Sequence, residues 1–182
     1  MDLRMVKTKQ QINRAFLILR ERLMPEKIKV KDICEVAMIN KTTFYNHYTD
    51  SAELENEINE LAIDKVIEAF SERDMLFVDP KAYILGLYHA LELEQSSLKL
   101  IFRGKLDTLC AILEQKLQIT YYNSTYDIDD RIRLSFAIGG FVRVIKDYIF
   151  EDVKCNIDQL ADSSVHILDE ILKLKSRSAA NA

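Results

Sequence analysis

The sequence is poor in the residues that make turns. Among its 182 residues there are four glycines and two prolines. A β-sandwich or a series of βα units needs a turn every dozen residues or so, and this chain cannot readily supply them. Hydrophobic residues make up 48% and charged residues 30% of the chain, which is the balance of a globular protein. We therefore expect an all-α fold with long helices.

Cysteine is also scarce, and the three cysteines form no recognisable pattern. Cys34, Cys110 and Cys155 are far apart, and the sequence contains no CxxC pair. This spacing indicates neither a disulfide framework nor a zinc site, and it is typical of the reducing cytoplasm. The chain has no run of eighteen apolar residues, and its first residues lack an apolar signal-peptide core. We expect a cytoplasmic protein that does not interact with a membrane.

The motifs of common enzyme classes are absent as well. We find no nucleophile elbow, P-loop, HExxH motif or dinucleotide-binding glycine pattern. His47, His89 and His166 fall in three different predicted helices, and neither His89 nor His166 is part of the Glu-x-x-His order of a di-metal bundle. We therefore expect no catalytic residue, no metal and no cofactor.

Charge is distributed unevenly along the chain. Residues 1–50 hold ten Lys and Arg against six Asp and Glu, whereas the rest of the chain is acidic and the formal net charge is -4. A basic first segment on an acidic body indicates that the first segment binds a polyanion.

Hydrophobic spacing divides the first segment into three helices. Thr8 and Gln11 predict a capping box for a helix that ends before Pro25. A second helix is predicted over 30–37, and Asn40 is expected to cap a third helix that ends at His47. Two short helices joined by a tight turn are the layout of a helix-turn-helix DNA reader.

The remaining spacing predicts a helical body. The expected helices cover 51–73, 80–93, 96–102, 104–122, 127–150 and a last segment that Asn156 caps. Asp50 with Glu53, and Asp79 followed by Pro80, are the expected starts of two of them. The last two helices carry apolar residues around most of their circumference, which predicts that two helices from each copy form a four-helix dimer interface.

The run VKDICEVAMINKTTFYNHYTDSAEL, residues 30–54, resembles the DNA-binding domain of the tetracycline-repressor (TetR/AcrR-like) family. The positions that match the family pattern are Val30, Asp32, Ile33, Ala37, Ile39, Thr43, Phe44, Tyr45, His47, Tyr48, Glu53 and Leu54. The resemblance implies a helix-turn-helix domain over 1–49 and a helical ligand-binding and dimerisation domain over 50–182. It also implies a homodimeric regulator that represses by default, binds a palindromic operator and is released by a small molecule.

DNA-contacting residues are expected around the second and third helices. Residues at the start of the recognition helix read base edges, and those beside it contact phosphates. The expected set is Lys29, Lys31, Asn40, Lys41, Thr42, Thr43, Tyr45, Asn46 and His47, with Lys7 and Lys9 adding charge nearby. The roles of Tyr45 and His47 as phosphate contacts are implied by the resemblance.

The sequence departs from the family pattern at several positions. Met38 replaces the turn glycine and Thr42 replaces a second glycine, so both positions place a side chain where the family has none. Lys29 stands where Ser or Thr usually caps the helix, and Ser51 replaces a phosphate-contacting lysine. These differences predict an altered sequence specificity.

The body leaves two functions open. A cavity for a small apolar or aromatic ligand is implied by the resemblance, with candidate lining residues Tyr83, Leu87, His89, Phe102, Phe136 and Phe141. Alternatively, the body binds a protein partner, and the chain acts as a co-activator or interaction scaffold. An apolar cavity with convergent polar groups would favour the ligand, whereas a filled core with an exposed apolar patch would favour the partner.

Overall fold

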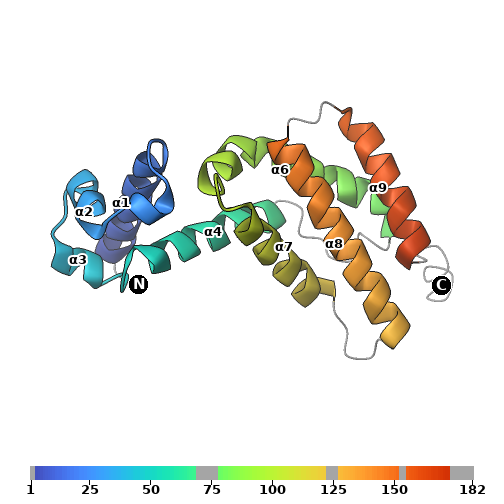
Figure 1. Ribbon diagram of the computed structural model, residues 1–182, viewed down its shortest axis with the longest axis horizontal. Coiled ribbons are helices and arrows are strands. Elements are labelled where there is room, and N and C mark those ends of the chain that lie inside the picture. The colour runs from blue at the N-terminus through green and yellow to red at the C-terminus, as the bar shows by residue number, and fades with distance from the viewer. Residues whose placement is uncertain (1–2, 69–77, 122–126, 152–154, 173–182) are drawn as a thin grey trace. The chain divides into compact units, whose positions relative to one another are not determined.

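The computed structural model describes residues 3–68, 78–121, 127–151 and 155–172, and these residues are helical with no strand. The elements are α1 (Leu3–Arg20), the 3-10 turn η1 (Pro25–Lys27), α2 (Val30–Ala37), α3 (Lys41–Tyr45), α4 (Ser51–Glu68), α6 (Pro80–Ile101), α7 (Leu106–Tyr121), α8 (Ile128–Phe150) and α9 (Ile157–Leu172), as Figure 1 shows. The all-α class expected from the sequence is confirmed.

The described residues group into two compact units. The first unit contains residues 1–62 and 97–105, and the second contains residues 63–96 and 106–182. Helices α4 and α6 each contribute residues to both units. The expected boundary after residue 49 concerns function and stays a prediction.

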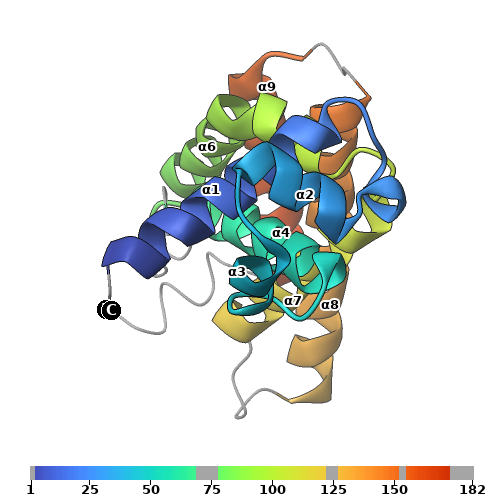
Figure 2. The ribbon, with the colours of Figure 1, turned by 90° about the vertical axis from the view of Figure 1, so that its left-hand side faces the viewer.

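The first unit is built around one apolar core to which α1, α2 and α3 contribute. Figure 2 shows these three helices. Apolar residues recur at helical spacing on the inner face of each helix, so folding removes them together from water. The buried side chains at its centre are Ile12, Phe16, Ile33, Phe44, Tyr48 and Leu54.

In the second unit α8 packs against α7 on one side and against α9 on the other. Its buried residues are Ala137, Ile138, Val142, Ile145 and Ile149. A buried hydrogen bond in this core joins the hydroxyls of Tyr88 and Ser164 at 2.8 Å. The Tyr88 ring also lies 6.0 Å from Phe141 and 5.7 Å from Tyr148 between ring centroids.

Several helix boundaries agree with the sequence predictions. Helix α2 spans the predicted residues 30–37, and α8 begins after Asp127, whose side chain accepts a hydrogen bond from the Asp130 N–H at 2.8 Å. Asp79 and Asn156 accept hydrogen bonds from the first turns of α6 and α9. Side chains that satisfy the free N–H groups of a first turn are therefore reliable helix-start signals here.

Three boundary predictions are wrong. Helix α1 already begins at Leu3, and the Thr8 hydroxyl donates back to the Arg4 carbonyl instead of capping a helix start. Residues 80–101 form one helix without the expected break, because buried Leu91 and Leu98 continue the apolar stripe across the polar residues between them. Helix α3 ends at Tyr45, two residues earlier than expected. The predicted extension of α4 to residue 73 lies outside the described residues.

Candidate nucleic-acid interface

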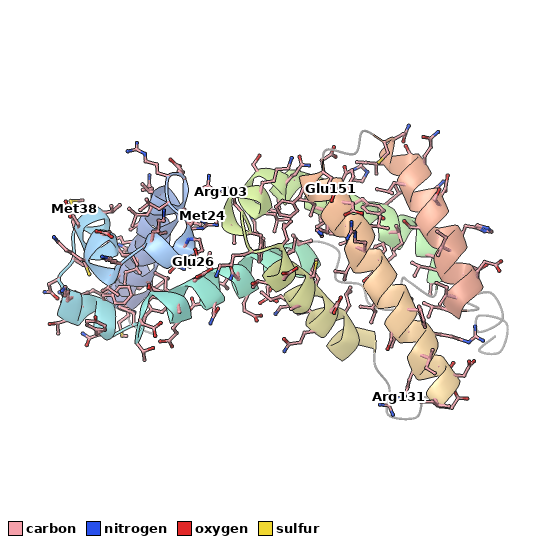
Figure 3. All side chains as sticks on the ribbon, viewed as in Figure 1. Met24, Glu26, Met38, Arg103, Arg131 and Glu151 are labelled. Carbon is pink, nitrogen blue, oxygen red and sulfur yellow. The ribbon has the colours of Figure 1, made fainter. Side chains whose placement is uncertain are left out.

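The turn between α2 and α3 closes through backbone hydrogen bonds. Met38 has φ +53° in the left-handed region, and its N–H donates to the Glu35 carbonyl at 3.2 Å. The Ile39 N–H donates to the Cys34 carbonyl at 3.0 Å. This is the Schellman arrangement that usually places glycine at the left-handed position. The tight turn thus forms without its glycine, and the Met38 side chain is 90% exposed at the turn (Figure 3).

We expect Met38→Gly to stabilise the protein. A side chain in the left-handed region costs about 1–2 kcal/mol, and glycine removes this cost while adding some entropy to the unfolded chain. The net gain in the free energy of unfolding should be about 0.5–1 kcal/mol in urea titrations. Val36→Gly, inside α2, is the matched control and should destabilise by about 1 kcal/mol. A loss of stability in Met38→Gly would contradict the strain argument.

Asn40 fixes the start of α3. Its side-chain oxygen accepts hydrogen bonds from the Thr43 N–H at 2.7 Å and from the Thr43 hydroxyl at 3.0 Å. The Asn40 cap predicted from the sequence is therefore present. Because the Thr43 hydroxyl already donates to this cap, Lys41 and Thr42 are the exposed side chains at the start of the helix.

The start of α2 carries two exposed lysines, Lys29 and Lys31. Lysine has no acceptor with which to cap a helix, and the Lys29 N–H instead donates to the Asp32 carboxylate at 3.2 Å. Cations beside a helix N-terminus are unfavourable because that end carries partial positive charge. The two lysines therefore do not serve to stabilise α2.

Tyr45, Asn46 and His47 follow on from α3. The Tyr45 side chain is 54% exposed and its ring meets the buried Phe44 ring edge-on, at 5.6 Å between centroids. Asn46 is exposed and His47 is half-buried, with its ring 6.4 Å from that of Tyr48. The predicted DNA contacts on or beside α3 that are exposed to solvent are thus Asn40, Lys41, Thr42, Tyr45 and Asn46.

A polar network holds the end of the recognition segment to α1 and α4. The buried Tyr48 hydroxyl donates to the Asn13 side-chain oxygen at 2.9 Å, and it lies 3.4 Å from the Glu57 carboxylate. Burial first, and Glu57 second, raise the pKa of Tyr48 well above its ordinary value. Lys9 pairs with Glu57 at 2.8 Å, so its charge is used inside this network. Sequence reasoning did not find this role of Lys9 or of Tyr48.

The six candidate ligand residues fall in two different units. Phe102 belongs to the first unit, whereas the other five belong to the second. Tyr83 and Leu87 are buried, but His89 is exposed and lies 3.7 Å from Glu92. Phe136 is 71% exposed. Their assignment to a ligand site stays a prediction.

Helix α8 has an exposed apolar stripe. Ile128, Ile132 and Phe136 are exposed at intervals of four residues along its first half. With Arg131 and Ser135 they line an open hollow on the surface of this helix. Among the described residues, no group of three or more His, Cys, Asp or Glu side chains could hold a metal ion. None of the described helices is long and apolar enough to cross a membrane.

Comparison with solved structures shows what fold the chain resembles. No protein-family model matches the sequence, and no curated protein does either. The solved structure of the dihydroxyacetone kinase operon activator DhaS aligns with 93% of this chain and 98% of its own, with 20% sequence identity and a TM-score of 0.58. The chain shares the fold of DhaS. At this level of identity the match shows the fold alone.

Proposed function

We propose that the chain is a homodimeric DNA-binding transcriptional regulator. The observation that carries the proposal is the start of α3, where Asn40 caps the helix and Lys41 and Thr42 are exposed. In a helix-turn-helix protein this end of the second helix enters the major groove. Lysine donates to the acceptors of guanine, and threonine offers a hydroxyl to a base edge and a methyl to thymine.

The charges beside α3 support a polyanionic partner. Lys29 and Lys31 lie at the end of α2 where cations are electrostatically unfavourable, so a function other than stability explains them best. Phosphate contacts supply much of the affinity of DNA-binding proteins and fix their orientation on the duplex. We assign Lys29, Lys31, Tyr45, Asn46 and His47 to phosphates, and Lys41 and Thr42 to bases.

A second copy completes the proposed reader. One helix-turn-helix covers too few base pairs for specificity, and a dimer reads two half-sites about one helical turn apart. The exposed residues Ile128, Ile132 and Phe136 on α8 support an interface made by α8 and α9 of both copies. The operator would then be an inverted repeat.

Two routes of regulation follow. In the first, a small apolar or aromatic ligand binds the body and releases a repressor from its operator, as the resemblance to the tetracycline-repressor family implies. In the second, a protein partner binds the body and the chain acts as a co-activator. The burial of Tyr83 and Leu87, and the fold shared with a protein named as an operon activator, favour the second route.

The decisive experiment is selection of bound duplexes from a random DNA pool at physiological salt. The wild type should enrich an inverted repeat. The variant Lys41→Ala, Thr42→Ala should bind that repeat at least about 100-fold more weakly, because each lost base contact costs about 1–3 kcal/mol and both half-sites are affected.

Lys27→Ala is the matched control, because it removes one exposed lysine of the same unit outside the proposed base-reading residues. It should bind the selected repeat with nearly unchanged affinity. Failure of the wild type to enrich any repeat, or an equal loss in both variants, would overturn the assignment of α3 as the reading helix.

A further inference from the structure

Two helix ends that are far apart in the chain meet inside the first unit. Helix α1 ends at Arg20 and α6 ends at Ile101, and both ends belong to this unit. The last turn of every helix leaves carbonyl groups without partners in the helix and carries partial negative charge. Two such ends repel each other unless positive donors lie between them.

Arg20 provides these donors for the end of α6. Its side chain is fully buried, at 0% exposure, although arginine is seldom found in a core. The guanidinium donates to the carbonyls of Leu100 at 3.1 Å, Ile101 at 2.9 Å and Arg103 at 3.0 Å. It also donates to the Leu23 carbonyl at 2.9 Å. A residue of α1 therefore caps α6.

Arg103 returns the contact to the end of α1. Its guanidinium donates to the carbonyl of Arg20, and it reaches the carbonyls of Leu23 at 3.4 Å and Glu21 at 3.5 Å. Each arginine thus binds carbonyls at the helix end that carries the other. We name this pair of contacts the arginine exchange.

Neighbouring groups hold the arginine exchange in place. Glu26 and Glu55 offset the positive charge that is clustered here, and Lys105 pairs with them at 2.9 Å and 3.7 Å. Gly104 has φ +77°, and a Cβ at this position would overlap the end of the Met24 side chain. Figure 3 shows Met24, Glu26 and Arg103 close to one another. The segment after α6 is therefore fitted to the turn after α1.

We infer that the arginine exchange couples α6 to the DNA-binding helices, with Arg20 as the positioning residue. Residues 80–96 of α6 belong to the second unit, whereas residues 97–105 belong to the first. A shift of α6 reaches α1 as a rigid displacement only while its last turn stays bound to Arg20. Helix α6 is then a second connection to the reading helix, besides α4. The regulatory consequence rests on the proposed function.

Arg20→Met tests the coupling with two readouts. Amide hydrogen exchange of residues 97–105 should become about 100-fold faster, because four hydrogen bonds to their helix end and to Leu23 are lost. The second readout is affinity for the selected inverted repeat with one base pair inserted between its half-sites. Wild-type protein should lose about 100-fold on insertion, whereas the variant with a loosened α6 should lose less than about tenfold.

Arg103→Met is the second variant, for use if Arg20→Met does not fold. The Arg103 side chain is exposed, so its removal does not open the core. It should show both effects in the same direction. Arg22→Met, which removes an exposed arginine from the same turn, should show neither.

The inference would be overturned if amide exchange of residues 97–105 were as slow in both Arg20→Met and Arg103→Met as in the wild type. Faster amide exchange with an unchanged response to half-site spacing would also overturn it, because the two arginine contacts would then have only a structural role. Failure of the wild type to select any repeat would count against the proposed function, whereas the exchange rates of residues 97–105 would still decide whether the two arginines hold the segment.

Discussion

Phe44→Ala is expected to destabilise the first unit strongly and to weaken DNA binding with it. Phe44 is fully buried in the middle of α3, with its ring 5.6 Å from that of Tyr45 and 5.8 Å from that of Tyr48 between centroids. Truncating a buried phenylalanine costs about 3–5 kcal/mol through lost burial and the cavity left behind. A single domain is stable by only about 5–15 kcal/mol.

The measurement is urea unfolding of the full chain by circular dichroism, together with amide exchange in α1, α2 and α3. Loss of protection should be concentrated in these helices, and α8 and α9 should keep theirs because they belong to the second unit. A loss of stability below about 1 kcal/mol would show that Phe44 is not central to this core.

Tyr45→Ala is the matched control, because it truncates the next aromatic residue of the same helix. The Tyr45 side chain is half-exposed, so its removal should change the free energy of unfolding by less than about 1 kcal/mol. As a proposed phosphate contact it should nevertheless lower affinity for all DNA sequences alike. The two variants therefore separate the packing role of α3 from its binding role.

The elements that sequence reasoning located well are those specified by local contacts. Asn40 caps α3 and Asp127 caps α8, because a short polar side chain reaches the free N–H groups three residues ahead. The boundaries of α2 follow from the helical spacing of its apolar residues, in a short segment with a turn at each end. The left-handed turn at Met38 was also indicated, since the resemblance places a glycine there.

What the sequence could not give depends on contacts between distant residues. Arg20 reads as an exposed cation at a helix end, yet it is buried because its carbonyl partners lie about eighty residues further along the chain. Lys9 was expected to add positive charge near the DNA contacts, but it pairs with Glu57 of α4. The exposure of Phe136 was missed for a similar reason: only the packing of α7 and α9 decides which side of α8 is covered.

Phe136→Asp is expected to convert the proposed dimer into a monomer. Phe136 is the largest apolar side chain of the exposed stripe on α8, and a two-fold interface contains it twice. Losing a central aromatic residue costs an interface about 2 kcal/mol or more, so two copies and a buried charge should weaken dimerisation at least about 1000-fold. Sedimentation of the purified protein measures this, and affinity for the inverted repeat should fall with it.

Leu93→Asp is the control that makes this result specific to α8. Leu93 is also a large exposed apolar residue of the second unit, at 84% exposure, but it lies on α6, outside the proposed interface. The control should sediment as the wild type does and keep its affinity for the repeat. A dimer that survives Phe136→Asp would remove α8 from the interface and leave its apolar stripe to a protein partner, which is the second route of regulation. If Phe136→Asp dissociates and Leu93→Asp does not, the two-fold axis lies beside α8. Each operator contact made by α3 would then occur twice, once in each half-site.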